Sequence, residues 1–190
     1  MFHRDLNMLK DGFKKYTFIA IAFTVCSFNA KASNQSIWDH FSDYATYSLV
    51  ASSIAIPSYG RDMESVKESA YTIGSAAAIS LLGKSLISEE RPDHSGNDSF
   101  PSNHTSVAFA SATNLYIKYG WQAGLPAYGL SSLVAIGRVE SEKHHWKDVV
   151  AGAAIGSLSA YFFTTPLNDS ISLVPWVDRE QAGLSLSMRW

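Results

Sequence analysis

The sequence predicts an all-α protein, a compact bundle of helices that is followed by a short C-terminal β-hairpin. Two observations lead to this fold class. Most of the chain consists of long segments rich in Ala, Ser and Gly, and these segments end at Pro or Gly, the residues that most often stop a helix. Apolar and polar residues alternate near the C-terminus, and a period of two is typical of strands.

The composition is that of a single globular domain. The chain has 190 residues, of which 46% are hydrophobic and 17% are charged, and its mean hydropathy is −0.02. This balance excludes wholesale disorder, and it is too polar for a chain that lies mostly within a membrane. The single cysteine, Cys26, excludes a disulfide framework and any cysteine-based zinc site.

Residues 1–32 have the layout of a secretory signal peptide. Basic residues precede an apolar run from Tyr16 to Phe28, and Ala30-Lys31-Ala32 follows as a small-x-small cleavage site. The run is short for a membrane anchor, which needs about 20 apolar residues, although a retained anchor is an alternative. We expect an exported protein of the periplasm, soluble or peripherally bound to the membrane. Helices embedded in the inner membrane are the second alternative, because residues 149–168 carry no charge.

The charge of the chain argues against a nucleic-acid partner. The predicted leader holds five of the 15 Lys and Arg residues and two of the 17 acidic residues, so ten cations and fifteen anions remain, a net charge of −5. A nucleic-acid-binding protein normally presents a basic face, and the sequence after the leader contains no basic cluster.

Five helices are expected in a domain that covers residues 33–168. Their ends follow from Pro, Gly and polar stretches. The expected ranges are 36–56, 63–89, 102–119 or 105–119, 126–136 and 143–163. The tail, residues 169–190, is expected to form a hairpin docked on the helices, with strands at 170–174 and 184–188 on either side of a turn at 178–183.

Three short blocks contain residues that suit an oxyanion. In the first, Lys84-SLISEE-Arg91-Pro92, the two cations are seven residues apart, so both can project from one face of a helix. Arg offers a planar set of N–H donors to phosphate oxygens, and Lys offers a mobile point charge. Taken alone, this block also fits a solvated helix end.

The second block, Pro101-Ser102-Asn103-His104, opens the third expected helix. The free N–H groups and the dipole at a helix N-terminus favour an anion. Ser102 fits equally well as an ordinary N-cap. A cationic His104 in the first turn would oppose the helix dipole, so its presence there suggests a chemical task.

In the third block, Arg138 is followed by His144 and Asp148. The last two are four residues apart, so on a helix they share a face and can hydrogen-bond. A carboxylate on one imidazole nitrogen leaves the other nitrogen free to attack or to bind. The same spacing is also typical of a plain helix-stabilising pair. His145 receives no role.

Together, the blocks KSLISEERP, PSNH and GRVESEKHHWKD resemble the motifs of the type 2 phosphatidic acid phosphatase (PAP2) family, which includes bacterial acid phosphatases and vanadium haloperoxidases. Their order and internal spacings agree over residues 84–148. Two positions depart from the pattern, because Asn103 stands where the family usually has Gly and Gly137 where it has Ser. The resemblance implies the helical fold of the family and a phosphatase that needs neither a cofactor nor a metal.

The resemblance also implies a role for each motif residue. His144 would attack phosphorus and form a phosphohistidine, Asp148 would orient its ring, and His104 would protonate the leaving oxygen. The implied phosphate-binding residues are Lys84, Arg91, Ser102, Asn103 through its N–H, and Arg138. The expected substrate is a phosphomonoester or pyrophosphate group of a membrane lipid, and the expected partner is that phosphorylated lipid.

Other interpretations stay open. A periplasmic acid phosphatase that acts on small phosphomonoesters would use the same residues, and so would a vanadate-dependent haloperoxidase, although that class generally has longer chains. A serine hydrolase acting through Ser102 lacks the G-x-S-x-G motif, and a non-catalytic envelope protein would not need a complete set of motif residues. The candidate ligands of a metal hydrolase match no known ligand spacing; they are Asp93, His94, Asp98, His144, His145 and Asp148.

Overall fold

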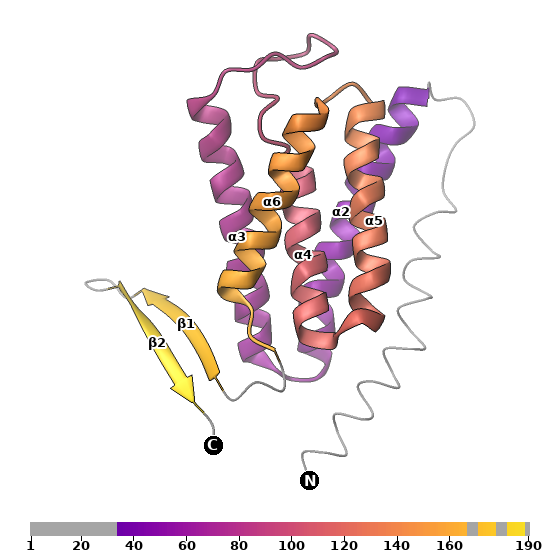
Figure 1. Ribbon diagram of the computed structural model, residues 1–190. Helices are drawn as coiled ribbons and strands as arrows, with labels where there is room; N and C mark the ends of the chain where they lie inside the picture. The colour runs from indigo at the N-terminus through magenta and orange to yellow at the C-terminus, as the bar shows by residue number, and fades with distance from the viewer. Residues whose placement is uncertain (1–33, 167–170, 178–181, 189–190) are drawn as a thin grey trace.

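A computed structural model of the chain describes residues 34–166, 171–177 and 182–188. In this part of the chain the elements are α2 (Asn34–Tyr59), α3 (Met63–Leu86), α4 (Asn103–Tyr119), α5 (Trp121–Glu140), α6 (Trp146–Phe163), β1 (Ile171–Val177) and β2 (Ala182–Met188). The helices lie side by side in one bundle (Figure 1), which confirms the predicted fold class. The predicted signal peptide, residues 1–32, lies outside the described residues.

Helix α4 lies at the centre of the bundle and packs against each of the other four described helices. Its sequence suits this position, because Ala, Ser and Thr let neighbouring helices approach closely from every side. Eleven of its 17 residues are buried. The apolar core joins α2, α4 and α5 and consists of Ala45, Leu49, Ala108, Ala112, Leu115, Ala123, Ala127 and Val134.

Glycines bring α6 directly onto the backbone of α4. A Cβ atom on Gly156 would lie 2.0 Å from the carbonyl oxygen of Ser106, and one on Gly152 would lie 2.6 Å from the carbonyl oxygen of Ser102. The two helices begin at the same end of the bundle, where the Ser102 N–H donates to the carbonyl oxygen of Asp148 at 3.1 Å. The close packing thus places two motif residues side by side.

Several helix ends differ from the expected ones. Helix α2 continues past Pro57, and α5 begins at Trp121, with Pro126 inside it. A proline near a helix end removes one backbone hydrogen bond, and here it does not end the helix. Helix α3 ends at Leu86, before the expected residue 89, because Ile87 is extended and its N–H closes the helix on Gly83.

Strands β1 and β2 form the expected antiparallel hairpin. They pair from Ile171 with Met188 to Val177 with Ala182, so both strands are longer than the sequence indicated. In Figure 1 the hairpin lies near the ends of α3 and α6 that are remote from the α3–α4 loop. Its docking on the helices stays a prediction.

The outer faces of the described helices carry many large apolar side chains, whereas buried positions are mostly Ala, Ser and Thr. Exposed examples from each helix are Tyr47, Leu82, Tyr116, Leu125 and Leu158. Within residues 34–166, none of the helices combines the length and the apolar character that a membrane crossing requires.

Candidate active site

The eight residues that the motifs single out lie at one end of the bundle, the end that carries the α3–α4 loop and the α5–α6 connection (top of Figure 1). They come from four helices and two loops. Lys84 lies in the last turn of α3, and Arg91 lies in the α3–α4 loop. Ser102 is the N-cap of α4, and Asn103 and His104 begin that helix. Arg138 lies in the last turn of α5, His144 precedes α6, and Asp148 lies in the first turn of α6.

Arg91 and Lys84 meet at Asp98, a residue of the α3–α4 loop. Arg91 Nε lies 2.8 Å from Asp98 Oδ1, and Arg91 Nη2 donates to Oδ2 at 2.9 Å. Lys84 Nζ donates to the backbone carbonyl of Asp98 and lies 3.7 Å from Oδ2. Burial lowers the pKa of Lys84 despite this nearby carboxylate.

The expectation that Lys84 and Arg91 share one helix face is wrong, because α3 ends between them. The chain instead folds back on itself, with the Glu89 N–H bonded to the carbonyl of Asn97 and the Ser99 N–H bonded to the carbonyl of Glu89. This pairing fixes the backbone on both sides of Asp98. The two cations are therefore brought together by the loop and not by helical periodicity.

Ser102 and Asn103 form the start of α4. Ser102 is fully buried, and its hydroxyl lies 3.0 Å from Thr105 Oγ1 and caps no backbone N–H of the helix. The Asn103 Oδ1 atom is buried without a hydrogen-bond partner. Asn103 is helical and does not have a positive φ. The backbone here therefore makes no demand for glycine, and a side chain fits where the family has none.

His104 faces α2. Its Nε2 atom lies 2.9 Å from Asp43 Oδ1. Burial and the positive charge of Arg138 lower the pKa of His104 below its ordinary value, against the opposing effect of Asp43. The ring thus lies between a carboxylate that favours its protonated form and a cation that disfavours it.

Arg138 is held by two carboxylates of α2. Its Nη1 atom donates to Asp39 Oδ1 at 2.5 Å and lies 3.7 Å from Asp43 Oδ1. The preceding Gly137 is explained by the same contact between helices, because a Cβ atom there would lie 2.7 Å from the hydroxyl oxygen of Ser42. A Ser42 hydroxyl from α2 therefore occupies the space beside the position where the family has its own Ser.

His144 is buried, with 2% of its surface exposed. Its Nδ1 atom lies 2.7 Å from the carbonyl oxygen of Ser99. A carbonyl only accepts, so Nδ1 carries the hydrogen and Nε2 holds the free lone pair. Burial lowers the pKa of His144 to about 3, and the positive charges of Arg138 and Lys84 add to this effect. The ring is neutral at ordinary pH.

The expectation that His144 and Asp148 hydrogen-bond across a shared helix face is wrong, because α6 begins only at Trp146. Their nearest atoms, Nδ1 and Oδ2, are 3.7 Å apart. The Asp148 carboxylate instead accepts from the Ser99 hydroxyl at 2.5 Å and from the His145 N–H at 2.8 Å. Ser99 thus connects the two residues, since its carbonyl holds His144 and its hydroxyl holds Asp148.

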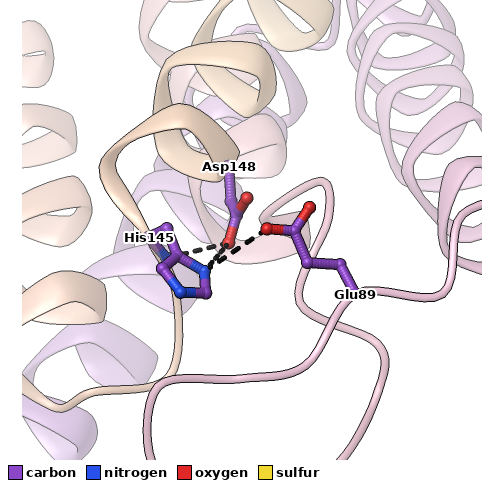
Figure 2. Close-up of side chains that lie close together, drawn as sticks. All are labelled: Glu89, His145 and Asp148. Carbon is purple, nitrogen blue, oxygen red and sulfur yellow. Dashed lines mark hydrogen bonds and ion pairs between the residues drawn. The ribbon is translucent and has the colours of Figure 1, made fainter.

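The neighbour of His144 in the sequence, His145, lies between Glu89 and Asp148 (Figure 2). Its Nδ1 atom is 3.6 Å from Glu89 Oε1 and 3.4 Å from Asp148 Oδ2. These three are grouped closely enough to hold a metal ion. The two carboxylates that a metal ion would need already have other partners, however, because Lys147 pairs with Glu89 and Ser99 donates to Asp148. His145 Nδ1, in contrast, is buried without a hydrogen bond.

The six candidate metal ligands considered from the sequence do not come together as one set, although two of them, His145 and Asp148, lie in the group just described. Asp93 pairs with Lys143 at 2.6 Å, His94 pairs with Glu90 at 2.7 Å, and Asp98 pairs with Arg91. Three of the six residues are therefore occupied by separate partners.

Sequence reasoning missed four residues of this site: Asp39, Asp43, Glu89 and Ser99. The motifs assigned a chemical role to none of them. Three of them contact motif residues that are more than 40 positions away in the sequence. Asp39 and Asp43 are four residues apart on one helix, so the sequence indicated that they share a face. Which helix they would meet was not indicated.

Comparisons with known proteins agree with the motifs. The family model of the PAP2 superfamily matches residues 66–171, more than half of the chain. Lipid A 1-phosphatase of Porphyromonas gingivalis is 37% identical over 79 residues, which are 40% of this chain and 18% of that protein. Lipid phosphate phosphatase 1 of Arabidopsis thaliana is 42% identical over 81 residues, which are 35% of this chain and 25% of that protein. The chain therefore matches only a quarter or less of these two relatives.

Two solved structures share the fold. The crystal structure of Aquifex aeolicus LpxE superposes with a TM-score of 0.58 at 21% identity, covering 67% of this chain and 82% of that one. The transmembrane PAP2 type phosphatidylglycerolphosphate phosphatase of Bacillus subtilis gives a TM-score of 0.56 at 18% identity, covering 84% and 90%.

Proposed function

Because the chain belongs to the PAP2 superfamily, we propose that it is a phosphatase that removes a phosphate group from a membrane lipid through a phosphohistidine intermediate, without a metal. The observation that carries this proposal is the pair of histidines at the cation-lined end of the bundle. His144 is buried and neutral with a free Nε2, whereas His104 lies against a carboxylate. These environments suit a nucleophile and an acid, respectively.

In the first step, the Nε2 lone pair of His144 attacks phosphorus in line, and the bond from phosphorus to the leaving oxygen breaks. His104 gives its proton to that oxygen. The imidazole becomes cationic, and the Ser99 carbonyl and the Asp148 carboxylate stabilise it from the Nδ1 side. In the second step, His104 takes a proton from water, the hydroxide attacks phosphorus, and the bond from phosphorus to nitrogen breaks.

The phosphate oxygens are held by groups that surround both histidines. Lys84, Arg91 and Arg138 supply positive charge, and Ser102 with the Asn103 N–H supplies donors at the positive end of the α4 dipole. The cations are close enough to His144 for all three to lower its pKa. Asp39 and Asp43 keep Arg138 oriented. Charge that moves to the oxygens during transfer is therefore met by groups already in place.

A lipid substrate is supported by the surface beside the site and by the names of the relatives. Leu86 and Ile87 follow Lys84 and are 82% and 43% exposed, and Trp146 and Val150 follow His144 and are 58% and 64% exposed. Such side chains can contact an acyl chain while the phosphate reaches the cations. A small phosphomonoester would leave them in water.

The location that this substrate requires is the surface of a membrane. We assign catalysis to residues 33–168, treat residues 1–32 as an export signal, and treat 169–190 as a hairpin extension. An exported phosphatase would meet its lipid from the periplasm, either peripherally bound or partly embedded. Flotation of the full chain with liposomes, compared with and without high salt, tests this location.

The test of the activity is phosphate release by the purified full chain in EDTA, from dioleoyl phosphatidic acid in mixed micelles and from p-nitrophenyl phosphate. We expect faster release from the lipid, complete loss in His144→Ala, and near-normal release in His145→Ala, the matched control on the adjacent residue. A rapid acid quench with radiolabelled substrate should trap an acid-labile phosphoenzyme. Retained turnover in His144→Ala would contradict the nucleophile, and loss in EDTA would contradict a metal-free reaction.

A further inference from the structure

The cations of the proposed phosphate site are already paired with carboxylates. Arg138 pairs with Asp39 and Asp43, and Arg91 and Lys84 pair with Asp98. Asp148 adds a fourth carboxylate at the same end. Among these side chains, the four acids outnumber the three cations. A doubly charged phosphate entering this site would be repelled unless one carboxylate moved away.

Asp98 is the carboxylate that can move. Its side chain is 50% exposed and belongs to a loop. The side chains of Asp39 and Asp43 are 33% exposed and extend from α2, and Asp148 is fully buried with two donors on one oxygen. A rotation about the side-chain bonds of Asp98 takes its carboxylate into water, whereas the less exposed Asp39 and Asp43 and the buried Asp148 have less room to turn away from the site.

We propose that Asp98 is a built-in competitor for the phosphate site: its carboxylate lies against the guanidinium of Arg91 and 3.7 Å from the Lys84 ammonium, and the phosphate of the substrate displaces it. The proposal rests on the proposed function, since it assigns those two cations to phosphate. The carboxylate takes the place that a phosphate would take, because Arg91 Nη2 donates to one of its oxygens and Arg91 Nε lies 2.8 Å from the other. The Nε atom makes no hydrogen bond there, so a phosphate can offer it a better partner.

Displacement of the carboxylate leaves the loop and Lys84 in place. The Lys84 ammonium donates to the backbone carbonyl of Asp98, which does not depend on the side chain. The backbone around Asp98 is held by the two hydrogen bonds to Glu89. The carboxylate is therefore not needed to position Lys84. Removing it should free the donors of the site without displacing Lys84, which is the result that distinguishes a competitor from a residue that only supports the site.

The competitor should affect small anions more than lipids. The free energy with which inorganic phosphate displaces Asp98 comes only from its contacts with the cations. A lipid phosphate also gains binding free energy from apolar contacts at Leu86, Ile87 and Trp146. Asp98 would therefore weaken product inhibition and disfavour free phosphate esters. The residue would act on the selectivity of the site and not on the chemical step.

The test is calorimetric titration of the full chain with inorganic phosphate at pH 7, together with inhibition of p-nitrophenyl phosphate hydrolysis by phosphate. For Asp98→Asn we expect phosphate binding about fivefold tighter, an estimate for one partly exposed ion pair, and a similarly lower inhibition constant. Asp98→Glu should restore the weaker binding. Circular dichroism spectra and melting temperatures would verify that each variant is folded.

The matched control is Asp93→Asn. This residue lies in the same loop and the substitution removes the same charge, but its partner is Lys143 and not a cation of the site. We expect its phosphate affinity to equal that of the wild-type protein. Equal tightening in both variants would overturn the proposal in favour of a general charge effect, and weaker binding in Asp98→Asn would show that the carboxylate only supports Arg91.

The two proposals fail in different ways. If the wild-type protein hydrolyses substrate and Asp98→Asn binds phosphate no more tightly than the wild-type protein, the proposed role of Asp98 is wrong and the proposed phosphatase activity stands. If no substrate is hydrolysed but Asp98→Asn binds phosphate more tightly than Asp93→Asn, the proposed role of Asp98 stands and the proposed phosphatase activity is wrong. If no substrate is hydrolysed and neither the variants nor the wild-type protein bind phosphate, both proposals are wrong.

Discussion

The acid of the proposed reaction depends on a residue outside every motif. Asp43 faces His104 from α2 at 2.9 Å and favours its protonated form, while burial and Arg138 favour the neutral one. Since burial and Arg138 prevail, the pKa of His104 is below its ordinary value. The protonated acid is therefore most abundant at acidic pH.

We expect kcat/KM to fall as pH rises through the pKa of His104, and Asp43→Asn to move this alkaline limb to lower pH by about one pH unit, because an opposite charge is removed. Initial rates between pH 4 and 8 on p-nitrophenyl phosphate would measure the limb. Glu64→Gln, an exposed acid paired with Lys67, is the control and should not move it. An unchanged limb in Asp43→Asn would mean that another group supplies the proton.

At the scale of elements, the site depends on how closely α6 approaches α4. Gly152 and Gly156 allow this approach, since a Cβ atom on Gly156 would enter the backbone of Ser106 and Ala110. The approach places Asp148, in the first turn of α6, beside Ser102 at the start of α4. A change in the packing of these helices would separate the nucleophile from the donors of α4.

Gly156→Ala should lower the free energy of unfolding by about 3 kcal/mol, because the added methyl group must push two helices apart. The matched control is Gly74→Ala in α3, where a Cβ atom would meet nothing within 4 Å. That substitution should stabilise the protein by about 0.5–1 kcal/mol, since glycine is a poor helix former. Denaturant unfolding of both variants measures the difference, and equal effects would contradict the close packing.

For the molecule as a whole, polar groups are buried throughout the bundle. Asn114 bonds Ser53 and Thr164 in the interior, and the nearly buried Lys118 pairs with Glu68 at the end remote from the site. Such groups stabilise the fold only while they keep their hydrogen-bond partners, and a buried group that changes its pKa on folding links stability to pH. Stability should therefore depend on pH, and His144 is the clearest contributor.

The free energy of unfolding should fall as pH drops from about 6.5 to about 3. His144 has its pKa lowered to about 3 in the fold, so across this window the unfolded chain binds a proton that the folded protein does not. The contribution of His144 is fully present above about pH 6.5 and amounts to about 5 kcal/mol over the window. Denaturant titrations at a series of pH values should show a smaller slope in His144→Asn; an unchanged slope would mean that His144 is not the cause.

The helical fold class, the hairpin and the eight motif residues of the site were predictable from the sequence alone. Helix-forming segments between Pro and Gly depend on local backbone preferences, and these act within a few residues. The three blocks were recognisable because residue types and spacings are properties of the chain.

The hydrogen-bond and ion-pair partners of the motif residues could be identified only in the folded structure. The ends of α3 and α6 placed Arg91 and His144 outside helices, so helical spacing gave the wrong neighbours for both. Ser99 and Asp98 became central because the loop folds back on Glu89, and Asp43 because α2 packs against α4. Contacts between segments far apart in sequence depend on the packing of helices, which side-chain shape determines over the whole bundle and which no local pattern encodes.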